Sequence, residues 1–119
     1  MKNNIIKEKS YDFALRIVKL YKYLRDSKKE FVIAKQLLRS GTSIGANIEE
    51  AVGAQSKSDF ISKISIAYKE ARESHFWIRL LKDSGYLTSK QSESLIIDIE
   101  EILKLITSIQ KTSKKIISN

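Results

Sequence analysis

The chain has 119 residues, and its 22 basic and 14 acidic side chains give a net charge of +8. This length suits one domain with its own hydrophobic core, so we expect a single domain over residues 1–119. The sequence contains no cysteine, which excludes disulfides, thiolate metal sites and a cysteine nucleophile, and no proline, which favours long uninterrupted helices.

The positive charge is concentrated at the two ends of the chain. Residues 1–30 contain nine basic and four acidic residues, and residues 111–119 contain three lysines and no acid, so these ends account for the whole excess. A basic excess attracts polyanions such as nucleic acid; the alternative is a lysine-rich surface that only keeps the protein soluble. No signal peptide or membrane-spanning stretch is evident, so we expect a cytoplasmic protein without a membrane partner.

Apolar residues recur at steps of three and four along four segments, which predicts four amphipathic helices. We expect them at about 10–26, 30–55, 58–84 and 88–112, followed by a basic C-terminal tail that frays. Short turns between long helices predict an all-α fold, an antiparallel up-down-up-down four-helix bundle.

The first helix is apolar on two sides. One stripe consists of Tyr11, Ala14 or Leu15, Val18, Tyr21 and Arg25, and the other of Phe13, Ile17, Leu20 and Leu24. Apolar residues outside the main stripes of the bundle exceed what a monomer needs to bury, which favours self-association; the alternative is a wide buried stripe. Examples of this surplus are Ile17, Leu20, Ile97 and Leu105.

Gly41 and Gly45 lie one turn apart on the apolar stripe of the second helix. A glycine costs a helix interior roughly 1 kcal/mol relative to alanine, so this position indicates close approach by a neighbouring helix. We expect that contact between the two middle helices. We further expect Ser58 to cap the third helix, Gly85 to end it in a left-handed conformation, and Thr88 or Ser89 to cap the fourth.

A polar stripe on the second helix is expected to face a stripe of polar and apolar residues on the third. If the chain folds back near Ser56, facing residues have numbers that sum to about 112, which sets Arg39 opposite Glu73. We expect this pair in a partly buried polar layer that specifies helix pairing; the alternative is a ligand or subunit site. The residues of the polar layer are Arg39, Ser43, Asn47, Glu50, Glu70, Glu73 and Trp77.

No arrangement of side chains typical of catalysis is present. Di-metal helical bundles use Glu-x-x-His steps, but Arg72 stands three residues before His75, the one histidine. Nucleophilic triads, phosphate loops and dinucleotide fingerprints are also missing. We therefore expect no catalytic, cofactor or metal site and no enzyme, with His75 as a structural or surface residue.

Basic residues recur at steps of three along the first helix and continue into the turn after it. Such a ridge could follow a phosphate backbone, and it would select little for sequence because no recognition helix or RNA-binding signature accompanies it. The alternative is a solvated face. The candidate nucleic-acid-binding residues are Arg16, Lys19, Lys22, Arg25, Lys28 and Lys29.

Two motifs carry a resemblance to a known family. Residues 37–51 read Leu-Leu-Arg-Ser-Gly-Thr-Ser-Ile-Gly-Ala-Asn-Ile-Glu-Glu-Ala, and residues 66–73 read Ile-Ala-Tyr-Lys-Glu-Ala-Arg-Glu. Together they resemble the bacterial four-helix bundle protein family, also called 23S ribosomal RNA intervening-sequence proteins, over about residues 10–115. The residues of the polar layer match positions characteristic of that family, whereas some relatives have proline where this chain has Gly45.

The resemblance implies an antiparallel bundle that assembles into a ring, commonly a homopentamer. Some members of the family are encoded inside insertions in 23S rRNA genes. A related branch comprises accessory proteins of diversity-generating retroelements, which form a basic pentameric barrel and bind both nucleic acid and a reverse transcriptase.

These observations favour a non-enzymatic, ring-forming helical scaffold that binds RNA or DNA through backbone electrostatics. The alternative is a protein-interaction subunit that partners a nucleic-acid enzyme, such as a reverse transcriptase, without itself binding nucleic acid. A third hypothesis is an enzyme whose site lies between subunits.

Overall fold

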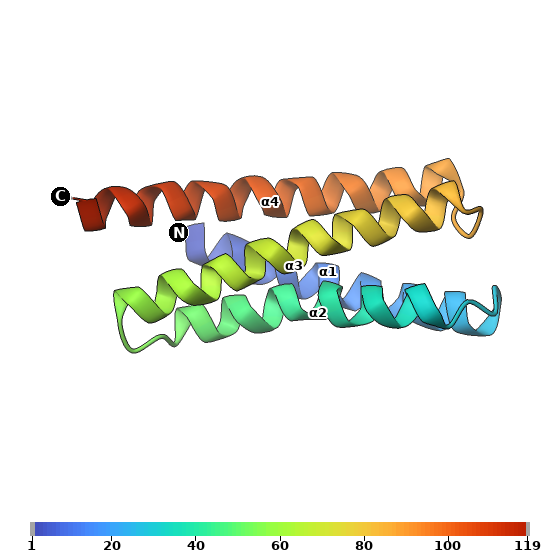
Figure 1. The fold of residues 1–119 in the computed structure, drawn as a ribbon, viewed down its shortest axis with the longest axis horizontal. Coiled ribbons are helices and arrows are strands. Elements are labelled where there is room, and N and C mark those ends of the chain that lie inside the picture. Colours follow the sequence, from blue (N-terminus) through green and yellow to red (C-terminus); the bar gives the residue numbers. More distant parts are fainter. Residues whose placement is uncertain (1, 119) are drawn as a thin grey trace.

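Four helices form the predicted four-helix bundle (Figure 1). The computed structural model describes the backbone of residues 2–118 and the side chains of residues 5–114. The helices are α1 (Lys2–Asp26), α2 (Val32–Val52), α3 (Lys57–Asp83) and α4 (Ser89–Ser118). No β-strand occurs within residues 2–118.

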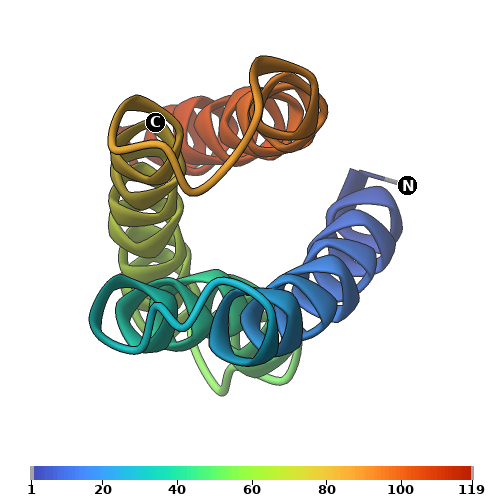
Figure 2. The same cartoon turned by 90° about the vertical axis from the view of Figure 1, so that its right-hand side faces the viewer.

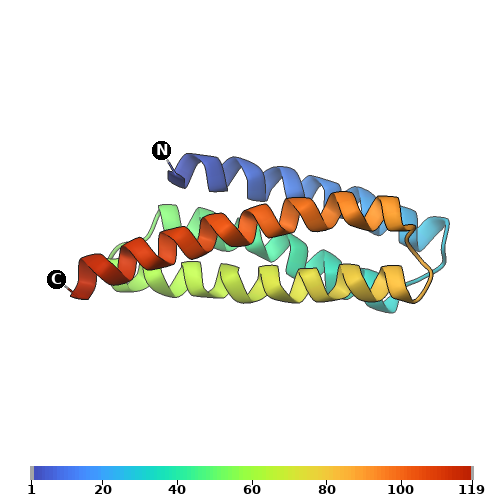
Figure 3. The ribbon, with the colours of Figure 1, turned by 90° about the horizontal axis from the view of Figure 1, so that it is seen from above.

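The helices follow one another around the bundle, so that each packs against its neighbours in sequence and α4 closes back onto α1 (Figure 2). In the described part of the chain, the backbones of diagonally opposite helices, α1 with α3 and α2 with α4, do not approach each other: no pair of their Cα atoms lies within 8 Å. The bundle measures 51 × 22 × 21 Å. The start of α1, the end of α4 and the α2–α3 turn lie at one end, and the other two turns lie at the opposite end (Figure 3).

The predicted inward stripes of α2, α3 and α4 are buried, but α1 turns only one of its two stripes inward. Phe13, Ile17 and Leu24 are buried, whereas Tyr11 and Leu15 are exposed. The assignment of Ile17 to a surface surplus was therefore wrong, because this side chain lies in the centre of the core with no exposed area.

Two helix lengths differ from the prediction at the ends of the chain. α1 begins at Lys2, where the pattern predicted about residue 10, because Ile6 and Ser10 continue the buried stripe of Phe13 toward the N-terminus. α4 continues to Ser118, through the segment that was predicted to fray.

The close approach predicted at the glycine pair is present, but it joins α2 to α1 and not to α3. A Cβ atom added to Gly41 would lie 2.8 Å from Cγ1 and 2.9 Å from Cγ2 of Ile17. A Cβ atom added to Gly45 would lie 3.3 Å from the backbone oxygen of Ser10. The two glycines thus let the backbones of α1 and α2 pack closely.

Side-chain hydrogen bonds mark where α3 and α4 begin. Ser56 caps α3 by accepting a hydrogen bond of 3.0 Å from the Asp59 backbone N–H, so the prediction of Ser58 was wrong by two residues. Thr88 caps α4 as expected, in a reciprocal pair with Gln91. Gly85, just after α3, has φ +90°, the left-handed conformation that glycine adopts without strain.

Candidate functional site

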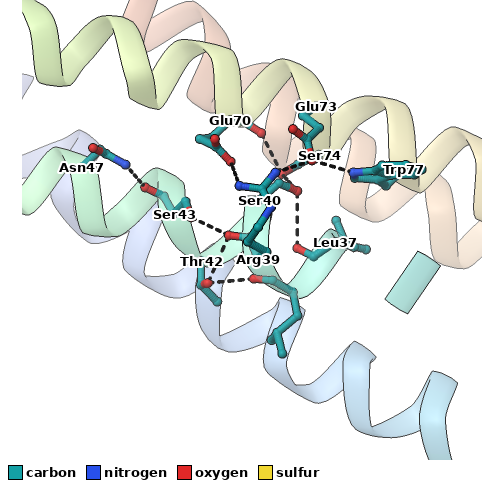
Figure 4. Close-up of polar contacts among 11 residues, drawn as sticks. Leu37, Arg39, Ser40, Thr42, Ser43, Asn47, Glu70, Glu73, Ser74 and Trp77 are labelled. Carbon is teal, nitrogen blue, oxygen red and sulfur yellow. Dashed lines mark hydrogen bonds and ion pairs between the residues drawn. The ribbon is translucent and has the colours of Figure 1, made fainter. Parts of the chain in front are cut away.

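The predicted contact between Arg39 of α2 and Glu73 of α3 is confirmed, and it belongs to a larger cluster (Figure 4). The Arg39 guanidinium donates one hydrogen bond to Glu73 and another, of 2.9 Å, to Glu70. The Trp77 indole N–H donates to the same Glu73 oxygen at 2.9 Å. We call these four residues, Arg39, Glu70, Glu73 and Trp77, the Arg39 cluster.

The Arg39 cluster lies at the surface and not inside the bundle. The Arg39 side chain is 49 % exposed, and those of Glu73 and Glu70 are 35 % and 18 % exposed. The hydrogen bond from Trp77 lowers the pKa of Glu73, partial burial opposes this change, and Arg39 lowers the pKa further. The hydrogen bond to Glu73 raises the pKa of Arg39. Both pKa changes favour the charged forms of Arg39 and Glu73.

The remaining residues of the polar layer extend along α2 from the Arg39 cluster. Ser43 donates to the backbone oxygen of Arg39 at 2.6 Å, and Asn47 donates to that of Ser43 at 2.8 Å (Figure 4). Glu50 crosses to α3, where it pairs with Lys63 at 3.0 Å. Ser43 and Asn47 thus hydrogen-bond within their own helix, and within the polar layer only the residues at its two ends bond across to α3.

A buried pair of serines joins α2 to α3 beneath the Arg39 cluster. Ser40 and Ser74 have no exposed area, and their hydroxyl oxygens lie 2.9 Å apart (Figure 4). This contact was not predicted from the sequence. The available signal was the presence of two serines on the apolar stripes, at positions whose numbers sum to nearly the same value as those of Arg39 and Glu73.

The ridge predicted on α1 is not a continuous row of free cations. Arg16 turns toward α4, where it pairs with Asp98 at 2.5 Å and donates to the Ser94 hydroxyl at 3.0 Å. Arg25 pairs with its neighbour Asp26 at 2.6 Å, and this hydrogen bond lowers the pKa of Asp26. Two of the six predicted residues are therefore occupied within the protein.

The other four residues of the ridge remain near solvent. Lys19 and Lys22 are exposed and form no hydrogen bond or ion pair with any described side chain. The Lys28 ammonium lies 6.0 Å from the centre of the Tyr23 ring. Lys29 lies in the α1–α2 turn with φ 56°. Lys19 and Lys22 are thus the cations of the predicted ridge on α1 that form no ion pair with a described side chain.

A second basic surface, which the sequence analysis missed, lies between α3 and α4. A hollow of about 420 Å³ opens there, lined in part by Tyr68 and Arg72 of α3 and by Lys104, Thr107 and Lys111 of α4. We call it the α3–α4 groove. Its cations come from segments far apart in the sequence, so only the faces of the two helices, taken together, could have indicated it.

His75 lies along the same pair of helices, with its Nε2 atom 3.7 Å from Glu100 Oε2. Among the described side chains, no group of three His, Asp or Glu residues is placed to hold a metal ion. No helix in the described part of the chain combines the length and the hydrophobicity needed to cross a membrane.

Comparison with known proteins identifies a matching family and a similar solved structure. The sequence profile of the 23S rRNA-intervening sequence protein family matches residues 2–108. A protein with unknown function from the S23 ribosomal protein family of Bacteroides thetaiotaomicron VPI-5482 shares 57 % sequence identity and superposes with a TM-score of 0.92. The alignment covers 93 % of this chain and 99 % of that one. No curated protein matches the chain.

Proposed function

The chain belongs to the 23S rRNA-intervening sequence protein family, and we propose that it is a non-enzymatic, ring-forming helical scaffold that binds RNA or DNA through the phosphate backbone. The observation that carries this proposal is the net charge of +8 together with exposed cations that have no carboxylate partner among the described side chains. These cations include Lys19, Lys22, Arg72, Lys104 and Lys111.

Backbone charge, rather than base recognition, fits the kind of surface that the bundle presents. The exposed cations are mostly lysines, which act as point charges on flexible stems. Contacts to phosphates fix the position of a nucleic acid but do not read its sequence. Binding should therefore be similar for unrelated sequences.

A salt titration with a generic RNA tests the proposal. If several lysines each neutralise a phosphate, counterions are released on binding, and the affinity should fall steeply as the salt concentration rises. Fluorescence anisotropy of a labelled RNA of mixed sequence would follow this fall, with a second RNA of shuffled sequence as the control for selectivity. Absence of binding even at low salt would contradict the proposal.

The ring is supported by two separate apolar surfaces. A ring built head to tail needs two different patches on each subunit. The outer side of α3 exposes Ile66, Phe76 and Leu80, which we call the α3 seam, and α1 exposes Tyr11 and Leu15. Since α1 and α3 are diagonal in the bundle, these surfaces lie on different sides of it (Figure 2). The homopentamer implied by the family resemblance is the assembly that we propose.

A protein-interaction subunit is the second candidate function. The α3 seam adjoins the Arg39 cluster, so apolar and charged groups meet on one surface of the bundle. Such a combination is common where one protein binds another. A protein that fails to bind RNA at low salt but captures a nucleic-acid enzyme through this surface would favour the second candidate.

A further inference from the structure

The α3–α4 groove places three cations around one hollow. α3 and α4 run antiparallel, and the contact between His75 and Glu100 sets facing residues at numbers that sum to 175. This register places Arg72 opposite Lys104, with Tyr68 one turn away opposite Thr107. Lys111 lies two turns along α4 from Lys104, at the far end of the same groove.

The charge of this groove is not neutralised from within. No acidic side chain lines the hollow. Arg72, Lys104 and Lys111 are exposed, and none of them forms an ion pair with a described side chain. The adjoining hollow along the same two helices differs, because Glu93 and Glu100 line it together with Arg79 and Lys82. Positive potential is therefore concentrated at one stretch of α3 and α4.

The spacing of the cations suits successive phosphates of one strand. Lys104 and Lys111 lie seven residues apart on a helix, which separates them by about 10 Å along its axis. Nucleotides stacked at about 3.4 Å per step would place roughly three phosphates over that length. In a stretched strand the rise per nucleotide is larger, so about two phosphates would then lie over the distance between Lys104 and Lys111.

Tyr68 adds to the groove an aromatic ring, which binding through the phosphate backbone alone would not require. Its half-buried ring lines the groove between the cations and packs partly against the core. An unpaired base can stack on such a ring while its phosphates meet the surrounding cations. In a duplex the base faces are already stacked on each other, so a tyrosine beside the backbone gains no such contact.

We propose that the α3–α4 groove binds a single-stranded segment of nucleic acid, with phosphates on Arg72, Lys104 and Lys111 and a base on Tyr68. This inference rests on the proposed nucleic-acid binding and gives it a location and a strand preference. It assigns the main contact to the groove and not to the ridge on α1.

Three double variants of equal net charge test the location. Lys104→Glu/Lys111→Glu alters the groove, and Lys19→Glu/Lys22→Glu alters the ridge. The control variant, Lys35→Glu/Lys57→Glu, alters two exposed lysines that lie on other parts of the described surface and form no ion pair. Each substitution removes two units of charge, so every double variant has a net charge of +4 in place of +8. Anisotropy with labelled oligouridylate and oligothymidylate would measure binding, after circular dichroism has verified the helical fold of each variant.

We expect the groove variant to lose about tenfold or more in affinity for both strands and its salt slope to fall by about 1.4, as expected for two lost phosphate contacts. The other two double variants should stay within about threefold of the natural protein. A base stacked on Tyr68 further predicts about a tenfold loss for Tyr68→Leu, little change for Tyr68→Phe, and weaker binding of a duplex of equal length.

Several results would overturn the inference, and they differ from those that would overturn the proposed function. Equal losses in all three double variants would show that only net charge matters, and loss in the ridge variant alone would move the contact to α1. Equal competition by polyglutamate would indicate an acidic protein segment in the groove. If all three variants lose affinity equally, or if only the ridge variant does, the protein still binds nucleic acid and the proposed function stands. A natural protein that binds neither oligonucleotide at low salt would refute both the proposed function and the proposed groove site.

Discussion

Arg39 makes two of the polar contacts between α2 and α3. An isolated surface ion pair contributes little to stability, typically about 0.2–1 kcal/mol. Arg39 differs from that case because it bridges two carboxylates, Glu70 and Glu73, which are three residues apart on α3 and repel each other without it. Trp77 fixes Glu73 from the other side. The geometry thus favours a role in helix pairing.

Arg39→Ala should lower the free energy of unfolding by about 1 kcal/mol, because it removes two charge-assisted hydrogen bonds and leaves two carboxylates side by side. Urea denaturation followed by circular dichroism would measure this change. Lys35→Ala, which removes an exposed cation without an ion pair from the same helix, is the matched control and should be nearly neutral. Unchanged stability combined with lost RNA binding would instead assign Arg39 to a binding site.

At the scale of the helices, the spacing of apolar residues predicted the number of helices and the inward faces of three of them. It could not choose between the two stripes of α1, because Tyr11 and Phe13 are both apolar and only packing decides which side is buried. It also could not identify α1 as the neighbour of the glycines, since the stripe of α2 shows that a helix comes close but not which one. Arg16 was assigned to a ridge because its partner Asp98 is distant in the sequence.

Gly41→Ala should destabilise the contact between α1 and α2. Alanine favours a helix by about 1 kcal/mol over glycine, but the added methyl group would lie below 3 Å from two carbons of Ile17. Ile17 is fully buried and branched at Cβ, so it has little room to move, and overpacking of this kind costs roughly 1–3 kcal/mol. We expect a net loss of about 1 kcal/mol in urea denaturation.

Gly53→Ala provides the control for this substitution. An added Cβ atom at Gly53 would come no closer than 3.9 Å to its neighbours, and the residue has φ −92°, which alanine also adopts. Stability should therefore stay equal or rise slightly. A Gly41→Ala protein as stable as the natural one would show that α1 can move away from α2 without loss of packing.

At the scale of the whole molecule, the bundle separates its surfaces by helix pair. On the α2–α3 side, cations pair with carboxylates in the Arg39 cluster and in the Glu50–Lys63 pair, whereas the cations of the α3–α4 groove form no ion pair with a described side chain. The sequence located the basic excess at the chain ends, yet the groove draws on Arg72 and Lys104 from the neutral middle. Net charge along a chain does not reveal charge on one face, because helices bring distant segments together.

The proposed ring predicts a particle with five times the 13.6 kDa mass of the single chain in light scattering. Leu80→Lys should reduce that mass because it places a charge on the α3 seam, while the helical fold persists, since Leu80 is already 37 % exposed. Val32→Lys is the control, because Val32 is apolar and 73 % exposed but lies outside both proposed surfaces. A natural protein that is monomeric at all concentrations would contradict the ring.

The junction between α1 and α4 is the weakest of the four junctions between adjacent helices. These two helices share the least contact of the four adjacent pairs, and two ion pairs, Arg16–Asp98 and Lys9–Glu101, bridge them. Dissolved ions screen such exposed pairs, while they leave burial of apolar side chains at the other junctions largely intact. Salt that releases a bound nucleic acid would therefore also weaken these two ion pairs, by about 1 kcal/mol each at most. Any local opening of the bundle should then begin between α1 and α4, on the side opposite the α2–α3 junction.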